Sequence, residues 1–311
     1  FYSDDVVMEA LTYRGRLAKE DVWDYCLIGC VEPSLGGQEW PACGGNGTET
    51  YTNIVNGFLM AINNGYNPIP GPDGKPNPVQ YGPATGYLYE MNSIEEVREA
   101  YRKISEYVFN WHVTLNNYTE QFLPYFWPQP GLSIYIDGCM ESGKDIVAGG
   151  AKHNSFGGTA TGLATIADSF NTIKYMCFEK KTCTTRDLYV AVMASWEGYV
   201  ELRQQILAEV PHYGNGDPYA DDIMKWVVDT YYDCCQCCYS KRAKHYKAGL
   251  YGAAQHIIQG GKTWATPDGR KKGEPLADAT SPAQGRDKHG PTAVMRSACC
   301  FDHSKFMDGI A

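Results

Sequence analysis

The chain has 311 residues, of which 43% are hydrophobic and 20% are charged, a composition that is ordinary for a globular protein with a large core. Its 27 basic and 36 acidic residues give a net charge of −9 without any Lys/Arg-rich run, which excludes the electrostatic footprint of a nucleic-acid binder and makes an anionic membrane a poor partner. No apolar stretch approaches the roughly 18 residues needed to span a bilayer, and no signal-peptide pattern opens the chain. The 12 cysteines lack the spacing of a secreted disulfide scaffold, so we expect reduced thiols and a cytoplasmic protein.

The run from Tyr25 to Leu35 places a cysteine, Cys30, two residues before a carboxylate, Glu32. In an extended backbone, residues i and i+2 point to the same side, so this thiol and this carboxylate can reach one small molecule together. Cys26 lies four residues earlier but is not followed by Val-Glu, and we interpret it as a packing residue. Cys30 and Glu32 are therefore the candidate reaction centre.

A long helix is expected from Ser93, which forms a capping-box pattern with Glu96. Apolar residues then follow at alternating spacings of four and three, which predicts a continuously buried face. These residues are Val97, Tyr101, Ile104, Val108, Trp111, Leu115, Tyr118 and Phe122. Pro124 is expected to end the helix. The Pro/Gly-rich stretch before it, residues 67–83, contains turn dipeptides and is interpreted as a long functional loop.

Residues 132–136 form a short apolar run with the length of a buried strand. A Gly-rich turn over 138–150 leads from it to a helical stretch near 159–180, and this strand, loop and helix order is typical of an α/β barrel. Glu141 then follows a strand end, where a barrel presents its working residues.

Further helical pattern covers 185–210, opened by Thr184 with Asp187 three residues on, and also covers 221 to about 247. The second stretch contains the cluster Cys234-Cys-Gln-Cys-Cys238, whose Cys-x-x-Cys pairs suggest a metal site. Four thiolates so close together on a helix cannot easily surround one tetrahedral ion, so we interpret the cluster as packing and expect no metal. Residues 266–291 form a second Pro/Gly-rich loop.

Three segments together resemble the glycyl radical enzymes, relatives of pyruvate formate-lyase that include dehydratases, carbon–nitrogen lyases and arylacetate decarboxylases. The string Gly29-Cys-Val-Glu-Pro33 is similar to the active-site loop of that family, and 138–151 is similar to the segment between a barrel strand and the next helix. Pro267-Asp-Gly-Arg270, with 276–287 and 290–293 after it, resembles the stretch that leads to the radical-bearing domain. The segments occur in the order found in the family.

The resemblance implies an α/β fold, part of a ten-stranded α/β barrel of the pyruvate formate-lyase type, with the Cys30 loop at its centre. We expect residues 1–311 to be the central and C-terminal part of this catalytic barrel domain. The family stores its radical on a glycine in an Arg-Val-x-Gly-Tyr-like loop, and this sequence has no such string. The glycyl radical domain is therefore expected outside this chain, and the fragment itself is expected to be inactive.

The resemblance also implies roles for three residues. Cys30 would pass its hydrogen atom to the stored radical and become a thiyl radical, and Glu32 would be the acid–base partner or, alternatively, a carboxylate that stabilises its loop. Glu141 would pair with Glu32 or bind substrate, or it would hold the Gly-rich loop. The implied cofactor is a protein-based glycyl radical, which a partner enzyme that uses S-adenosylmethionine and an iron–sulfur cluster installs.

The expected reaction is radical cleavage of a carbon–carbon or carbon–heteroatom bond. The C-terminal residues 281–287 and 301–309 resemble the 4-hydroxyphenylacetate decarboxylase branch, which implies decarboxylation of an arylacetate. The alternative is a dehydratase or carbon–nitrogen lyase acting on a small polyol or amino alcohol. A different class, a structural or metal-binding protein built around its cysteines, is also kept open. The expected partners are a small-molecule substrate and the activating enzyme. The protein is also expected to form a homo-oligomer.

Overall fold

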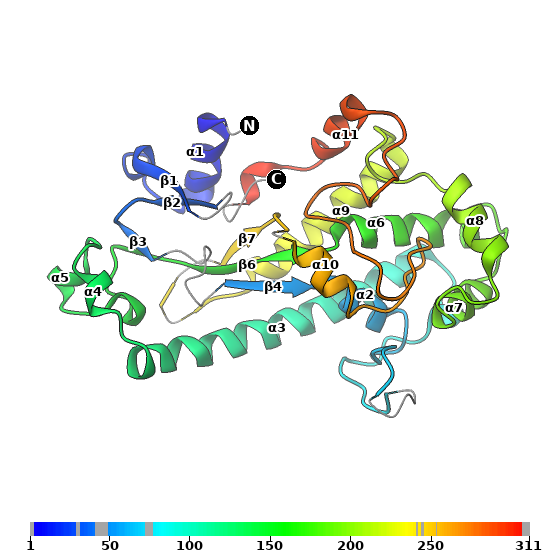
Figure 1. Ribbon diagram of the computed structural model, residues 1–311, viewed down its shortest axis with the longest axis horizontal. Helices are drawn as coiled ribbons and strands as arrows, with labels where there is room; N and C mark the ends of the chain where they lie inside the picture. The colour runs from blue at the N-terminus through cyan, green and yellow to red at the C-terminus, as the bar shows by residue number, and fades with distance from the viewer. Residues whose placement is uncertain are drawn as a thin grey trace.

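The computed structural model describes residues 3–28, 32–40, 49–71, 77–240, 242–243, 246–252 and 254–306. Helices and short strands make up these residues (Figure 1). In chain order the described elements are α1 (Asp4–Thr12), η1 (Tyr13–Gly15), η2 (Asp21–Asp24), β1 (Tyr25–Ile28), β2 (Glu32–Leu35), β3 (Glu39–Trp40), β4 (Glu49–Asn53), α2 (Ile54–Ala61), η3 (Leu88–Glu90), α3 (Ile94–Phe126), α4 (Pro130–Ser133), α5 (Cys139–Ser142), η4 (Ile146–Ala148), β5 (His153–Asn154), β6 (Phe156–Thr161), α6 (Leu163–Thr172), η5 (Ile173–Glu179), α7 (Thr185–Met193), α8 (Val200–Glu209), α9 (Pro218–Gln236), β7 (Tyr246–Gly249), α10 (Gln255–Gly260), α11 (Pro291–Ala298) and η6 (His303–Lys305).

The central sheet consists of three parallel strands in the order β4, β6, β7 (Figure 1). Two smaller sheets are described as well, the antiparallel hairpin β1–β2 and the parallel pair β3–β5. The chain is thus mixed α/β, as expected. The described strands by themselves do not make a ten-stranded barrel, so the barrel stays a prediction for a longer protein.

The middle strand β6 is built almost entirely from small residues, and all of it is buried. Gly157 pairs with Glu49 on one side and with Lys247 on the other. A Cβ atom added to Gly157 would lie 2.1 Å from the backbone oxygen of Lys247, so the close approach of these backbones requires glycine at this position.

The prediction of a strand at 132–136 is wrong. Residues 130–133 form the short helix α4, and Leu132, Ile134 and Tyr135 are exposed. The strand that this part of the chain contributes to the central sheet lies later, at β6. An apolar run of this length can be a surface segment as well as a buried strand, and periodicity alone does not distinguish the two.

The long helix α3 begins where the sequence predicted. The Ser93 side chain accepts a hydrogen bond from the backbone N–H of Glu96, 3.2 Å away, and caps the helix. Pro124 does not end the helix, which continues to Phe126. Pro124 lies in the last turn, where its missing N–H removes one hydrogen bond at the end of the helix rather than in its interior.

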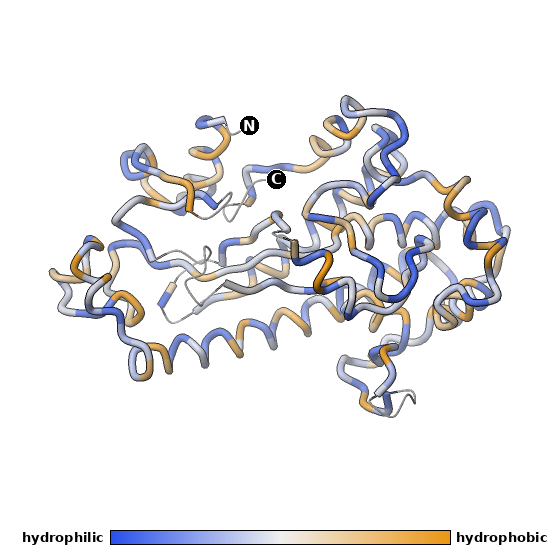
Figure 2. The backbone as a smooth tube through the Cα atoms, in the orientation of Figure 1, coloured by the Kyte–Doolittle hydropathy of each residue, from blue (hydrophilic) through white to orange (hydrophobic). Residues whose placement is uncertain are grey.

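The apolar face of α3 is buried in its first half and exposed in its second. Figure 2 shows alternating apolar and polar bands along the whole helix. In the first half Val97, Tyr101 and Ile104 are at most 1% exposed. In the second half the predicted face lies open, with Trp111, Leu115, Tyr118 and Phe122 all more than half exposed. The prediction of a continuously buried face is therefore wrong for the second half of α3 in this chain.

The other predicted helices are divided differently in the structure. Residues 159–180 hold the end of β6, then α6, then a π-helix, η5. The stretch 185–210 is two helices, α7 and α8, with Ser195 and Trp196 in left-handed conformations between them. Finally, 221–247 begins within α9 but ends in strand β7, and residues 241, 244 and 245 lie outside the described part.

The main core lies where α2, α3, α6 and α9 pack on one another and on the sheet. Aromatic rings form its centre: Phe170 of α6 lies edge-on to Phe58 of α2, Tyr101 of α3 and Trp226 of α9, with ring centroids 5.1 to 5.6 Å apart. Such edge-to-face pairs stabilise the core beyond the area that they bury.

The loop 266–291 is held by buried polar contacts rather than being a linker. The Arg270 guanidinium donates to the backbone oxygens of Trp264, Gly260 and Glu274, at 2.6, 2.9 and 3.0 Å. Arg286 donates to the backbone oxygen of Asp268 at 2.9 Å. The Pro267-Asp-Gly-Arg270 motif thus fixes the loop against α10 and leaves its guanidinium no surface to present to a ligand. Within the described residues, no helix combines the length and apolar character needed to cross a membrane.

Candidate functional site

Glu32, the described member of the candidate reaction centre, belongs to the β1–β2 hairpin (Figure 1). Tyr25 pairs with Leu35 and Ile28 pairs with Glu32, so residues 29–31 connect the two strands. Cys30 is the middle residue of this connection and lies outside the described residues. Glu32 opens β2 and is only 3% exposed, so its carboxylate is held away from bulk water. Cys26, on the neighbouring strand, is exposed, so the prediction that it is a packing residue is wrong.

A second carboxylate, Glu39, fixes β2 to the central sheet. Its Oε2 accepts hydrogen bonds from Ser34 Oγ at 2.9 Å and from the backbone N–H of Leu35 at 3.2 Å. Its Oε1 lies 2.5 Å from Lys247 Nζ on β7, and both side chains are almost completely buried. Burial by itself raises the pKa of Glu39, but the Lys247 ammonium and these hydrogen bonds outweigh it and hold that pKa below its ordinary value. The strand that carries Glu32 is therefore joined to β7 by a buried ion pair.

A second buried ion pair joins α3 to the start of β6. Arg242 Nη2 lies 2.9 Å from Glu120 Oε1 and also donates to the backbone oxygen of Ser155 at 2.8 Å. Burial lowers the pKa of Arg242, and the Glu120 charge opposes that shift. Two buried cations, one from β7 and one from the segment before it, thus lie beside the central sheet.

A partly buried histidine of α3, His112, lies beside side chains of the sheet. His112 Nε2 is 3.1 Å from the Tyr246 hydroxyl and 3.3 Å from Asn116 Nδ2, while its Nδ1 is 3.4 Å from Thr52 Oγ1. Burial lowers the pKa of His112 to about 4, so the imidazole is neutral at physiological pH. A neutral imidazole can accept and donate hydrogen bonds in this polar cluster without adding charge to the interior.

The structure does not bring Glu141 together with Glu32. Glu141 is exposed on α5, and its Oε2 accepts a hydrogen bond from the backbone N–H of Gly138 at 2.9 Å, which caps the helix. Figure 1 places α5 at one end of the molecule, apart from the β1–β2 hairpin. The contact matches the loop-holding alternative for Glu141, and its role in catalysis stays a prediction.

The cysteine cluster lies at the end of α9. Cys234, Cys235 and Cys238 are buried, and burial raises the pKa of each thiol, to about 12 for Cys234 and Cys238. Thiols that stay protonated are poor metal ligands and poor nucleophiles. Across the described residues, no group of three or more His, Cys, Asp or Glu side chains is arranged to hold a metal ion.

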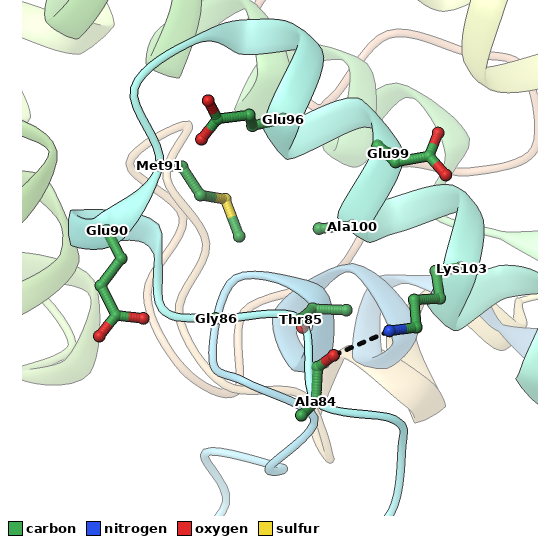
Figure 3. A pocket seen from close by; sticks show the side chains of 9 residues that line it. All are labelled: Ala84, Thr85, Gly86, Glu90, Met91, Glu96, Glu99, Ala100 and Lys103. Atoms are coloured by element: carbon green, nitrogen blue, oxygen red, sulfur yellow. Dashed lines mark hydrogen bonds between the residues drawn. The ribbon is translucent and has the colours of Figure 1, made fainter.

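Hollows on the surface of the described residues include two that the hairpin does not line. One, of about 340 Å³, lies between α3 and the segment before it and is lined by Glu90, Glu96, Glu99 and Lys103 among others (Figure 3). Two of its carboxylates accept backbone hydrogen bonds nearby, Glu90 from Tyr87 N and Glu96 from Asn92 N, both at 2.9 Å. The other hollow, of about 520 Å³, is lined by Tyr66, Tyr87, Tyr189 and Trp264 among others.

Sequence reasoning missed Glu39 and Lys247. Each gives a weak local signal: Glu39 stands beside Trp40, and Lys247 lies within an otherwise apolar stretch that becomes β7. A charged residue inside an apolar strand needs a partner of opposite charge if it is to be buried. The sequence does not show which residue that partner is, because the two lie far apart along the chain.

Comparison with known proteins gives a consistent answer. A family model described as pyruvate formate lyase-like matches residues 1–260. The chain is 32% identical over 305 residues to trans-4-hydroxy-L-proline dehydratase of Clostridioides difficile and 33% identical over 310 residues to (2S)-3-sulfopropanediol dehydratase of Klebsiella oxytoca. These alignments cover 98% and 97% of this chain but 37% and 36% of the relatives.

Solved structures agree. The B12-independent glycerol dehydratase of Clostridium butyricum, in its glycerol-bound form, superposes with a TM-score of 0.89 at 31% identity. The alignment covers 98% of this chain and 37% of that one. The chain therefore spans a little over a third of the length of these relatives. The relatives named here are dehydratases, so the comparisons favour the dehydratase alternative over the expected arylacetate decarboxylation.

Proposed function

The chain belongs to the pyruvate formate lyase-like family, and we propose that the full-length enzyme containing it is a glycyl radical dehydratase of a small hydroxylated substrate. The single observation that carries the proposal is the Gly29-Cys-Val-Glu-Pro33 string, whose Glu32 is buried. The similarity of the chain to three dehydratases supports it. Residues 1–311 would form the central and C-terminal part of a ten-stranded barrel domain, with the glycyl radical domain outside this chain.

In this proposal the glycyl radical, when present, supplies the ability to remove a hydrogen atom from Cys30. Cys30 then takes a hydrogen atom from the substrate carbon that bears a hydroxyl and returns it to the product. Glu32 takes the proton of that hydroxyl and passes a proton to the neighbouring hydroxyl, which leaves as water. Because Glu32 is shielded from water, a neutral substrate that can donate a hydrogen bond to it suits the site better than an anion beside it.

The ion pair of Glu39 and Lys247 supports the role of Glu32 by holding its strand on the central sheet. Glu39 holds Ser34 and Leu35, the last two residues of the strand that begins with Glu32, while Lys247 holds Glu39 on the sheet. A reaction centre on a short hairpin needs such support, because a misplacement of about 1 Å can cost on the order of 100-fold in rate. Glu39 and Lys247 would thus position Glu32 without touching the substrate.

Two partners belong to the proposal. An activating enzyme that uses S-adenosylmethionine and an iron–sulfur cluster would install the radical on the glycine outside this chain. The full-length enzyme would also form a homo-oligomer. Both rest on the family and not on a contact of the described residues.

The test uses the full-length enzyme after activation. Small diols, hydroxylated amino acids and arylacetates are offered separately, and water elimination and carbon dioxide release are measured. We expect dehydration. Cys30→Ser should abolish turnover while the glycyl radical signal in electron paramagnetic resonance persists, and Glu32→Gln should slow turnover by about 10²- to 10⁴-fold. Carbon dioxide release from an arylacetate without any dehydration would overturn the proposal, as would turnover by Cys30→Ser.

A further inference from the structure

Two cysteines far from the hairpin have their sulfur atoms in contact. Cys177 lies in the π-helix η5, and Cys183 lies directly before Thr184, which caps α7. Their Sγ atoms are 3.7 Å apart, and both thiols are free. A disulfide bond is about 2.05 Å long, so the atoms have to approach by less than 2 Å to join.

The backbone between them is folded so that the contact is built in. The N–H of Lys180 donates to the oxygen of Tyr175 at 2.8 Å, and the N–H of Thr182 donates to the oxygen of Met176 at 2.9 Å. Lys181 adopts a left-handed conformation with φ of 56°, which reverses the chain. The turn thus returns Cys183 over the last turn of η5 and onto Cys177.

The two thiols differ in environment. Cys177 is 9% exposed, whereas Cys183 is half-buried beside an exposed turn, so a small solute reaches Cys183 first. The hydrogen bond with Cys177 lowers the pKa of Cys183 and raises that of Cys177. Of the described cysteines with a displaced pKa, Cys183 alone has it lowered, and the thiolate is the reactive form of a cysteine.

We propose that Cys177 and Cys183 form a redox modification site, in which a small-molecule disulfide such as oxidised glutathione converts them to a reversible intrachain disulfide. The Cys183 thiolate attacks one sulfur of the small disulfide and releases one thiolate, which leaves a mixed disulfide on Cys183. Cys177 loses its proton and attacks the Cys183 sulfur, which releases the second thiolate. Two protein thiols are oxidised, one small disulfide is reduced to two thiols, and the two protons pass to the released thiolates.

The bond would staple η5 to the start of α7. Glu179, in the last turn of η5, already accepts a hydrogen bond from the Tyr219 hydroxyl of α9 at 2.8 Å. On the other side, Tyr189 of α7 lies edge-on to Tyr87 and Tyr89. The site therefore joins two helices that are each packed against a different part of the chain, and it does not depend on the proposed dehydratase activity.

Trypsin makes the test direct, because it cleaves after Lys174, Lys180, Lys181 and Arg186 and puts the two cysteines on separate peptides. The full-length protein is reduced, incubated without oxygen with oxidised glutathione, blocked with N-ethylmaleimide and digested. We expect mass spectrometry to find peptides 175–180 and 182–186 joined by a disulfide that dithiothreitol splits. Wild-type protein whose Cys183 keeps glutathione, joins another cysteine or is blocked by maleimide would overturn the proposal.

Three variants separate the two steps. Cys177→Ser should trap glutathione on Cys183, because the resolving thiol is gone. Cys183→Ser should leave Cys177 without glutathione and blocked by maleimide. Cys237→Ser removes an exposed cysteine outside the pair and should form the joined peptide as wild type does. Glutathione on Cys177 in Cys183→Ser, at the level seen on Cys183 in Cys177→Ser, would contradict the assigned order of attack.

Discussion

Replacing Lys247 by methionine tests whether the buried ion pair holds the hairpin in place. Glu39 and Lys247 are 4% and 2% exposed, so neither charge is solvated by bulk water. Removing one partner of such a pair leaves an uncompensated buried charge, and the expected loss in the free energy of unfolding is about 3–5 kcal/mol. Without the ammonium, only the hydrogen bonds from Ser34 and Leu35 oppose the effect of burial, so the pKa of Glu39 is expected to rise.

The assay is chemical unfolding of the full-length enzyme, followed by the fluorescence of its tryptophans. The matched control is Lys152→Met, because Lys152 also holds the hairpin region, through Asp21 at 2.8 Å, but its side chain is 44% exposed. An exposed pair of this kind contributes about 0–1 kcal/mol. The double variant Glu39→Gln with Lys247→Met removes both charges and keeps an oxygen that can accept from Ser34, so we expect it to recover most of the stability.

Each result bears on a different step of the reasoning. A loss in Lys247→Met no larger than in Lys152→Met would refute the claim that the buried pair stabilises the fold. A double variant as unstable as the single one would show that the loss comes from the packing of the lysine stem and not from an orphaned carboxylate. In the activated enzyme, we further expect Lys247→Met to lower turnover more than it lowers the glycyl radical signal, because Glu32 is displaced.

Two further predictions concern Glu141 and His112. Glu141→Gln should leave turnover of the activated enzyme close to wild type if Glu141 only holds its loop, because a glutamine oxygen can still accept from Gly138. A loss as large as in Glu32→Gln would instead support its predicted role in catalysis. The pKa of His112 falls from 6.5 to about 4 in the folded chain, so the unfolded chain takes up this proton first as the pH falls. The folded state therefore loses stability between pH 6.5 and pH 4, by up to about 3 kcal/mol. His112→Gln should remove this part of the pH dependence of the melting temperature, and an unchanged pH profile would contradict it.

Local contacts were the part of the fold that the sequence could predict. The cap of α3 by Ser93 needs only the backbone N–H three residues later, and the structure has that bond. The same holds for α7, where Thr184 and Asp187 bond to each other reciprocally. All the partners of such a motif lie within four residues, so the motif can be predicted without knowledge of tertiary contacts.

Strand β6 could not be predicted, because its burial is a property of its neighbours. It lies between two parallel strands, and its Gly157 leaves room for the backbone of Lys247 beside it. Glycine lowers the strand propensity of a sequence, so the residues that fit the centre of this sheet are those that propensity assigns elsewhere. The apolar run at 132–136 has the propensity but makes no strand contact. Propensity therefore pointed to the wrong segment.

The candidate site shows the same division. Cys30 and Glu32 are two residues apart, and a sequence motif can display them together. Glu39 and Lys247 meet only through the parallel sheet and the hairpin, and no spacing rule links them. Glu141 shows why the two alternatives for a carboxylate at a Gly-rich turn were kept open, because it has a local partner in the backbone at the start of its own helix. A carboxylate close in sequence to a free helix N-terminus should be tested first as a cap.

The second half of α3 shows what periodicity measures. The alternating spacing of Trp111, Leu115, Tyr118 and Phe122 predicts burial, yet each side chain is more than half exposed in this chain. The pattern identifies the apolar face of the helix, whereas the structure shows only the contacts that the described residues make with one another. The aligned relatives are longer, with this chain covering 36–38% of them. The periodic apolar face therefore predicts a helix correctly, but it does not predict that residues of the same chain cover that face.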